Sequence, residues 1–507
     1  MKKLLFILSA CVLLAVYFCG CTAADCENSG NLRAPDVTSE SSDAYSFEEV
    51  SKKYPDKTVL TWVSPMGTKD IDLDAVNKRL NALGKAYVLS LGSDLSASEM
   101  GSEMSYTDVV SKLMEQGKPV DIVYSWVYYA EADIGSNSYH RFIRKGIFEP
   151  INSYLEDTDI GKELYSLMPT GYWDSLKVGG SIYGLSGDLT MLSPIRYLFV
   201  NSELSAKYGY DVNKPFSEQT DVIGSIVEGE NCVGLYVSDP CGVDAYIREQ
   251  LVENCLYFDS SAQEFKCVTD NPDFRKTLKS YFEMYRDGLL LTKSSLEEES
   301  LKKLPFAVEY QLEGSGICLE DSMDVYTYGD NSYDMIPCLI SEAKLHSAKT
   351  ATGICSASKH KDESFDLLAT VHTDEYLCNL LCYGSAELDD KPVSSLNQSN
   401  YMRFSNKLIC HPQNWMYATT TPETARQGLE GQATPEAISF MFNPESVADE
   451  VKRLNIMMTY EFDGFLFSDS FSDFDEAMEA WREELNKAGL TAVLEEANRQ
   501  YKEGLAR

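Results

Sequence analysis

The clearest pattern of hydrophobic and polar positions lies between residues 58 and 126. It opens with Thr58–Val63, a β-branched and aromatic run that ends at a Ser-Pro pair, which predicts a strand. Apolar residues then recur at helical spacing from Ile71 to Leu83, with acidic residues in the first turn and a glycine at the stop, which predicts a helix. The alternation continues through a predicted strand over Ala86–Leu91, a helix over Tyr106–Gln116 and a strand over Val120–Tyr124. This part of the chain is therefore expected to form a β-α-β-α-β unit.

A unit of this kind predicts a parallel sheet with right-handed crossovers. Ligands of open α/β sheets bind beyond the carboxyl ends of the strands, which places Trp62–Ser64 and Ser125–Trp126 at one rim. The ring of a tryptophan has a slightly negative face, which suits the apolar, slightly positive C–H groups of a sugar. Both tryptophans are therefore candidate ligand contacts, although a large aromatic residue on a strand more often packs in the core.

The first twenty residues have the features of a secretory leader. Lys2 and Lys3 precede an apolar run that ends in small residues before Cys21, and the run is too short for a permanent membrane span. A cysteine directly after the cleavage point is the residue that receives the lipid of a bacterial lipoprotein; cleavage without lipidation is the alternative. We expect residues 1–20 to be removed, Cys21 to be lipidated and the polar residues 21–46 to form a flexible tether. The mature protein would then be anchored to the cell membrane on its extracellular face.

Composition excludes some partners more firmly than it identifies others. The chain has 44% hydrophobic and 24% charged residues, as folded proteins do, and its formal net charge is −35. That charge would repel phosphate backbones, and no cluster of lysine and arginine offsets it, so we expect no nucleic-acid partner. The acidity itself is better explained by the solubility of an exported protein.

The cysteines cannot form a complete disulfide framework. Of the 14 cysteines, three lie at positions 11, 19 and 21, and the number that remains is odd. The best local candidate for a bridge is Cys255 with Cys267, because the two bracket a pair of short strand-like runs joined by a polar turn. Cys378 and Cys382 lie four apart on a predicted helix without histidines at ligand spacing, so we expect buried small side chains and no metal site.

Several short blocks follow one another in an order that is typical of one family. They are Phe148–Ile151, Trp173–Leu185, Arg196–Asn201, Tyr333–Pro337, Gly353–His360, Ser364–Leu368, Thr373–Glu375, Leu380–Gly384, Gly464–Phe467 and Lys487–Leu490. Each block alone is a weak signal, but their order extends over most of the mature chain. Together they resemble the extracellular solute-binding proteins of bacterial ABC importers, of the family 1 or sugar-binding type, in the lipoprotein subgroup with an extended C-terminal region. Ser186 stands where that family commonly has proline.

The resemblance implies an α/β, periplasmic-binding-protein-like fold with two lobes that close by a hinge on a solute held in the cleft between them. The crossings between the lobes would lie near Leu192–Tyr197 and Ala348–Ile354, with a further return around Trp415. Lobe one would hold residues 47–193 with 352–410, and lobe two residues 194–351 with 411–507.

The sequence offers no assembled catalytic site. It contains no G-x-S-x-G elbow, no phosphate-binding P-loop and no H-E-x-x-H zinc motif, and its five histidines are not spaced as ligand pairs. We therefore expect a binding protein that is not an enzyme and needs neither cofactor nor metal. A glycoside hydrolase is the alternative from another class, because it needs only two carboxylates and the chain has 79 acidic residues. A surface adhesin, without a hinge or small-molecule affinity, is a third.

Seven residues are candidates for ligand binding. The aromatic ones would supply stacking faces, and Asp188, just after the Tyr183-Gly184 turn, would accept hydrogen bonds from neighbouring sugar hydroxyls; packing in the core is the alternative for each. The set is Trp62, Ser64, Trp126, Tyr183, Asp188, Trp415 and Tyr417. The resemblance implies a carbohydrate as the solute and the permease subunits of an ABC transporter as partners, with the lipid anchor reaching the membrane and the protein acting as a monomer. A peptide or an amino-sugar derivative remains an alternative solute.

Overall fold

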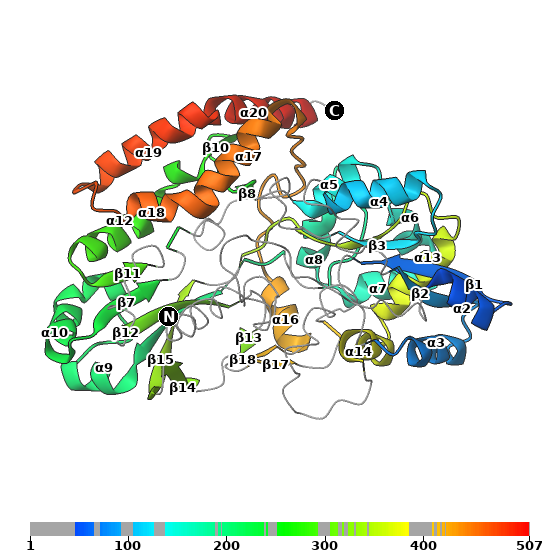
Figure 1. Ribbon diagram of the computed structural model, residues 1–507, viewed down its shortest axis with the longest axis horizontal. Coiled ribbons are helices and arrows are strands. Elements are labelled where there is room, and N and C mark those ends of the chain that lie inside the picture. Colours follow the sequence, from blue (N-terminus) through cyan, green and yellow to red (C-terminus); the bar gives the residue numbers. More distant parts are fainter. Residues whose placement is uncertain are drawn as a thin grey trace, which may run out of the picture.

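Two separate hydrophobic cores divide the chain into two lobes (Figure 1). The computed structural model describes residues 46–64, 71–92, 105–125, 137–187, 191–193, 195–237, 240–241, 251–292, 305–312, 317–318, 323–328, 331–341, 344–384, 408–409, 413–415, 418–420 and 422–505. The first core contains buried side chains between Val50 and Leu192 and again between Leu345 and Ile438, and it defines lobe one. The second contains side chains between Leu198 and Ala307 and between Phe442 and Tyr501, and it defines lobe two.

Lobe one is built on a four-stranded sheet with the strand order β16-β3-β1-β2. Its strands are β1 (Thr58–Val63), β2 (Tyr87–Gly92), β3 (Ile122–Tyr124) and β16 (Thr352–Ile354). β1 pairs in parallel with β2 and β3, whereas β16 pairs antiparallel with β3. The helices that connect the first three strands are α3 (Leu73–Ala82) and α4 (Tyr106–Glu115). The predicted β-α-β-α-β unit is therefore confirmed, with a fourth strand supplied from far along the chain.

The remaining elements of lobe one surround this sheet. They are α2 (Phe47–Lys53), α5 (Ser138–Arg144), α6 (Asn152–Asp157), α7 (Asp159–Leu167), α8 (Thr170–Leu176), the hairpin β4 (Lys177–Val178) and β5 (Ser181–Ile182), α13 (Lys361–Val371) and α14 (Glu375–Tyr383). Buried Asp121 fixes the segment after β16 to the start of β3: its carboxylate accepts hydrogen bonds from the Thr61 amide at 2.8 Å and the Ser358 hydroxyl at 2.5 Å. The block Gly353–His360 thus has a structural role, because it connects β16 to the start of β3 in lobe one.

Lobe two contains a six-stranded mixed sheet with the order β11-β7-β12-β6-β15-β14. Its strands are β6 (Ile195–Asn201), β7 (Val233–Val237), β11 (Leu290–Thr292), β12 (Pro305–Leu312), β14 (Met323–Tyr328) and β15 (Asn331–Ser341). The strands β11, β7 and β12 are parallel, and β6 is antiparallel to both β12 and β15. Its helices are α9 (Ser202–Tyr208), the 3-10 turn η2 (Phe216–Glu218), α10 (Thr220–Glu230), the 3-10 turn η3 (Val268–Asp270) and α12 (Pro272–Arg286).

Local chemistry explains where α12 begins and how it packs. The side chain of Asn271 accepts hydrogen bonds from the amides of Asp273 and Phe274, and Pro272 occupies the first turn, where its missing N–H is not needed. Buried residues at helical spacing, among them Phe274, Leu278 and Tyr281, then face the core of lobe two.

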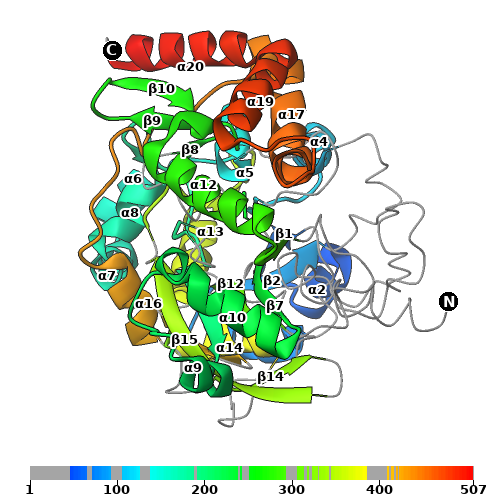
Figure 2. The ribbon, with the colours of Figure 1, turned by 90° about the vertical axis from the view of Figure 1, so that its left-hand side faces the viewer.

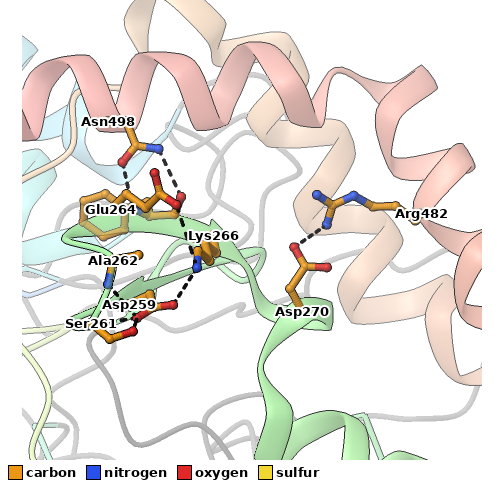
Figure 3. A network of polar contacts seen from close by, with 9 residues as sticks. Asp259, Ser261, Ala262, Glu264, Lys266, Asp270, Arg482 and Asn498 are labelled. Atoms are coloured by element: carbon orange, nitrogen blue, oxygen red, sulfur yellow. Dashed lines mark hydrogen bonds and ion pairs between the residues drawn. The ribbon is translucent and has the colours of Figure 1, made fainter.

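The end of the chain forms a helical layer over a small sheet of lobe two (Figure 2). The small sheet is β8 (Leu251–Val252), β9 (Leu256–Asp259) and β10 (Glu264–Cys267); the layer is the 3-10 turn η6 (Glu445–Val447), α17 (Ala448–Ile456), the π-helical turn η7 (Met457–Glu461), α18 (Phe462–Leu466), α19 (Phe474–Ala488) and α20 (Leu490–Leu505). Figure 3 shows two of the polar contacts that attach it. Asn498 exchanges hydrogen bonds with the backbone of Phe265 at 2.7 and 3.0 Å, and Arg482 pairs with Asp270 at 2.8 Å.

The candidate disulfide between Cys255 and Cys267 is not formed. Both thiols are free and fully buried, and burial raises the pKa of each. The register of the β9–β10 hairpin explains this outcome, because it places Leu256, and not Cys255, opposite Cys267. The thiols of Cys378 and Cys382 lie 3.9 Å apart and are buried on α14.

Another small sheet has the order β13-β18-β17. Its strands are β13 (Ile317–Cys318), β18 (Ala418–Thr420) and β17 (Gln413–Trp415), and α16 (Pro422–Leu429) follows it. Leu429 and Ile438 still belong to the core of lobe one, whereas Phe442 belongs to that of lobe two. Ala437 and Phe440 pack against the core of lobe two and Met441 against that of lobe one, so the final passage to lobe two lies within residues 437–442, later than the return expected around Trp415. Among the helices of the described ranges, none has the length and apolar character needed to span a bilayer.

Candidate functional site

The carboxyl ends of the parallel strands of lobe one form a rim. Ser64 follows β1 and Ser125 follows β3, and both side chains are buried. The Ser125 amide donates to the Ala351 carbonyl and its hydroxyl accepts from the Ala351 amide, both at 2.8 Å. The end of β3 is thus fixed to the segment that leads into β16.

A second segment, Tyr183–Gly187, reaches the same rim; we call it the rim segment. Leu185 pairs antiparallel with Thr352 through two hydrogen bonds of 2.8 Å, and β16 is itself antiparallel to β3. The rim segment is antiparallel to β16, and β16 is antiparallel to β3. The rim segment therefore runs in the same direction as β3 and ends at the carboxyl edge of the sheet. This is the edge at which open α/β sheets bind ligands.

Glycines allow the rim segment to lie this close to β16. A Cβ on Gly184 would lie 2.6 Å from the Thr352 carbonyl oxygen, and one on Gly353 would lie 2.6 Å from the Tyr183 carbonyl oxygen. Both approaches are too short for any side chain. The close contact therefore requires glycine on each side.

The corresponding edge of lobe two carries a buried ionic cluster. Arg196, at the start of β6, pairs with Glu309 of β12, and the Tyr281 hydroxyl donates to the same carboxylate. The side chains of Arg196 and Glu309 are each only 1% exposed. Burial raises the pKa of Glu309, and the Arg196 guanidinium opposes this shift. Because β6 is antiparallel to β12, Arg196 lies at the carboxyl edge of β7 and β12.

Two short crossings join these edges. The first crossing is Met191–Ser193 and the second is Lys344–Ala351. They pair antiparallel: the Ser193 amide donates to the Lys344 carbonyl at 2.8 Å, and the His346 amide donates to the Met191 carbonyl at 2.7 Å. The first crossing runs from the rim of lobe one directly to the ligand edge of lobe two. The region between the two edges is therefore the candidate site, and the first crossing overlaps the stretch Leu192–Tyr197 in which a crossing was expected.

The lobes also touch at α5. Nη1 of Arg144 donates to the carbonyl of Phe442 at 2.6 Å. Near it lies Glu253, in the turn between β8 and β9, with a φ of 54° and a hydrogen bond of 3.1 Å from Asn455. Burial raises the pKa of Glu253 to about 7, and the charges of Arg144 and Arg141 only partly oppose that shift. The contact between Arg144 and Phe442 therefore joins α5 of lobe one to lobe two beside the half-buried Glu253.

The structure places the predicted ligand residues as follows. Trp62 is fully buried in the core of lobe one, as its alternative reading expected. Ser64 lies buried at the rim, and Tyr183 lies half-buried at the start of the rim segment. Trp415 lies in β17, where only its backbone is described. The residues outside the described part of the chain are Trp126, Asp188, Tyr417 and the lipidation candidate Cys21.

Sequence reasoning missed the residues that hold the rim segment. The hydroxyl of Tyr139 accepts a hydrogen bond from the Tyr183 amide, and that of Tyr172 bonds both backbone groups of Ser186. Both tyrosines are fully buried. Their local patterns are those of ordinary core aromatics, so no signal in the sequence identifies them as partners of the rim segment.

Comparisons with known proteins extend over most of the chain. A protein of Streptococcus pneumoniae serotype 4 named "Carbohydrate ABC transporter substrate-binding protein" is 22% identical over 468 residues, which are 87% of this chain and 90% of that protein. The crystal structure of the N-glycan transport solute binding protein NgtS from Streptococcus pneumoniae matches with a TM-score of 0.61 and 19% identity, covering 89% of this chain and all of that one. This chain has the fold of the two-lobed sugar-binding proteins of ABC importers. The expected resemblance and fold class are confirmed.

A second solved structure supports the same fold. The "HMO binding ABC-transporter associated Solute Binding Protein" of Bifidobacterium longum infantis has a TM-score of 0.52 and 11% identity, covering 88% of this chain and 98% of that one. Residues 436–506 match a family described as "Domain of unknown function (DUF3502)". That stretch includes the helical layer η6 to α20, so the extended C-terminal region is the part of lobe two that covers its small sheet.

Proposed function

We propose that this protein captures a carbohydrate between its two lobes and delivers it to an ABC importer at the cell surface. The observation that carries the proposal is the likeness, along nearly the whole chain, to a two-lobed protein whose structure is described as that of an N-glycan transport solute binding protein. The named relative of similar length supports the same role.

The geometry of the candidate site supports capture by lobe closure. The two ligand edges are joined by two antiparallel crossings, so a rotation about them brings the edges together or apart without breaking either sheet. The backbone pairing of β15 with β6 shifts register between Leu339 and Ser341, directly beside the crossings. Such an irregularity locally weakens the ladder and allows it to bend.

We further propose that the protein is a lipoprotein anchored through Cys21. The leader before Cys21 and the polar composition of residues 21–46 support this. Expression of the full chain with a radiolabelled fatty acid tests it: the wild-type chain should carry label and stay with membranes, whereas Cys21→Ser should lose the label. A labelled Cys21→Ser chain would show that the anchor lies elsewhere.

Binding is tested by thermal shift and calorimetry against defined mono- and oligosaccharides, with peptides and polyamines as other solute classes. A sugar present at one hundred times its Kd should stabilise the native state by about 2.7 kcal/mol. A response to sugars supports the proposal. Flat curves for every sugar with a response to peptides would replace it by peptide import. Release of smaller sugars during incubation would favour a hydrolase.

Matched variants locate the site. We expect Asp188→Asn and Tyr183→Ala to weaken binding of the responding sugar about tenfold or more, because each removes a group that we assign to the ligand. Tyr376→Ala is the control: its side chain is 47% exposed on α14, with the Arg79 guanidinium 5.0 Å from its ring. Equal losses in the control and in the site variants would argue against the location.

A further inference from the structure

The rim segment has no long strand of its own, yet five of its backbone N–H and C=O groups are paired. Leu185 is held by Thr352, and the flanking residues are held by side chains from two helices. The Tyr183 amide donates to the Tyr139 hydroxyl of α5 at 2.9 Å. The Tyr172 hydroxyl of α8 accepts from the Ser186 amide and donates to the Ser186 carbonyl, both at 2.9 Å.

The same two helices also hold the second crossing. The Tyr139 amide donates to the Lys349 carbonyl at 3.0 Å, and the Ala348 amide donates to the Ser175 carbonyl of α8 at 2.9 Å. The Tyr139 hydroxyl donates to the Leu176 carbonyl at 2.9 Å, which ties α5 to the end of α8. The helices α5 and α8, which are hydrogen-bonded to each other, therefore hold both the rim segment and the second crossing.

The hydroxyl groups act where water cannot replace them. Both tyrosine side chains are fully buried, and Ser186 is 1% exposed. A buried amide or carbonyl that loses its partner bears the full cost of desolvation, so the backbone would leave this position to find another partner. The next residue but one after Ser186 is Asp188, a proposed ligand contact.

We propose that Tyr139 and Tyr172 are positioning residues for solute binding, which hold the rim segment so that it meets the sugar in a preformed arrangement. The inference rests on the proposed function. Preorganisation of a binding loop increases affinity, because no conformational entropy of the loop is then lost when the ligand binds. Tyr172 has the larger role, because it alone satisfies both backbone groups of Ser186.

The test compares Tyr172→Phe and Tyr139→Phe with Tyr87→Phe in the full chain. Each change removes one buried hydroxyl and keeps the ring. Tyr87 is 2% exposed on β2, and its hydroxyl donates to Asp366 at 2.5 Å, so it matches the others in burial without touching the rim segment. The probe is the sugar that the wild-type chain binds most tightly in the library of mono- and oligosaccharides.

We expect Tyr172→Phe to weaken the Kd about tenfold, Tyr139→Phe about threefold and Tyr87→Phe less than twofold. Hydrogen exchange of the unliganded protein should rise at residues 183–187 in the first two variants alone. A purely structural role would lower the melting temperature in all three and leave every Kd unchanged, which would overturn the inference. A wild-type chain that binds no sugar overturns the proposed function, and this inference with it.

Discussion

Replacing Gly353 by alanine should destabilise lobe one at the contact between β16 and the rim segment. The new Cβ would lie 2.6 Å from Cδ1 of Phe148 and 2.6 Å from the Tyr183 carbonyl oxygen. The ring of Phe148 is packed against those of Tyr139 and Phe142, at centroid distances of 6.1 and 5.1 Å. Neither neighbour is the free end of a flexible side chain, so the strand must shift. Overpacking of this kind costs about 1–3 kcal/mol, and we expect about 3 because one neighbour is backbone.

Urea unfolding followed by circular dichroism measures this loss. In a domain of this size, about 3 kcal/mol corresponds to a melting temperature lower by about 6–12 °C. Gly224→Ala is the matched control, because Gly224 lies inside α10 and a Cβ there meets nothing within 4 Å. Alanine is favoured over glycine in a helix by about 1 kcal/mol, so the control should be more stable than the wild type. A Gly353→Ala chain as stable as the wild type would refute the reasoning.

Two further predictions concern buried charges. Because the pKa of Glu253 is raised to about 7, its native carboxyl keeps a proton that the unfolded chain releases near pH 4.5, so stability is full below that pH and falls as pH rises toward 7. Glu253→Gln should remove this part of the pH dependence in urea midpoints taken between pH 4.5 and 8; an unchanged slope would count against the assignment. Arg196→Met alone should cost about 3–5 kcal/mol, because it removes the cation that pairs with the buried carboxylate of Glu309. The double change Arg196→Met with Glu309→Leu should recover most of that loss in the same assay, and a double variant no more stable than the single one would contradict this account.

Local periodicity was enough to predict the first sheet of lobe one. The strands near Thr58, Tyr87 and Ile122 and the helices between them lie within a few residues of their predicted bounds. Each of these elements is set by its own apolar spacing and caps, such as the Asp72 side chain that accepts from the Ala75 amide. Elements of this kind depend little on the rest of the chain.

Features set by distant contacts could not be predicted in the same way. The rim location of Trp62 follows from the strand direction, but its complete burial depends on what covers the sheet. Whether Cys255 and Cys267 can form a disulfide depends on the register of the β9–β10 hairpin. That register places Cys267 opposite Leu256, one residue away from Cys255. The roles of Tyr139 and Tyr172 depend on hydrogen bonds to a segment that is 44 and 14 residues away in sequence. No local pattern marks such partners.

Because β16 lies late in the sequence, it determines the order in which the sheets of the two lobes can be completed during synthesis. All six strands of the lobe two sheet lie between Ile195 and Ser341, so they are synthesised before Thr352–Ile354. The sheet nearer the N-terminus must wait for that strand, and its core must wait further for Leu429 and Ile438. A nascent chain of this architecture therefore finishes its second sheet before its first, and its opening segment stays incomplete until most of the polypeptide has been made.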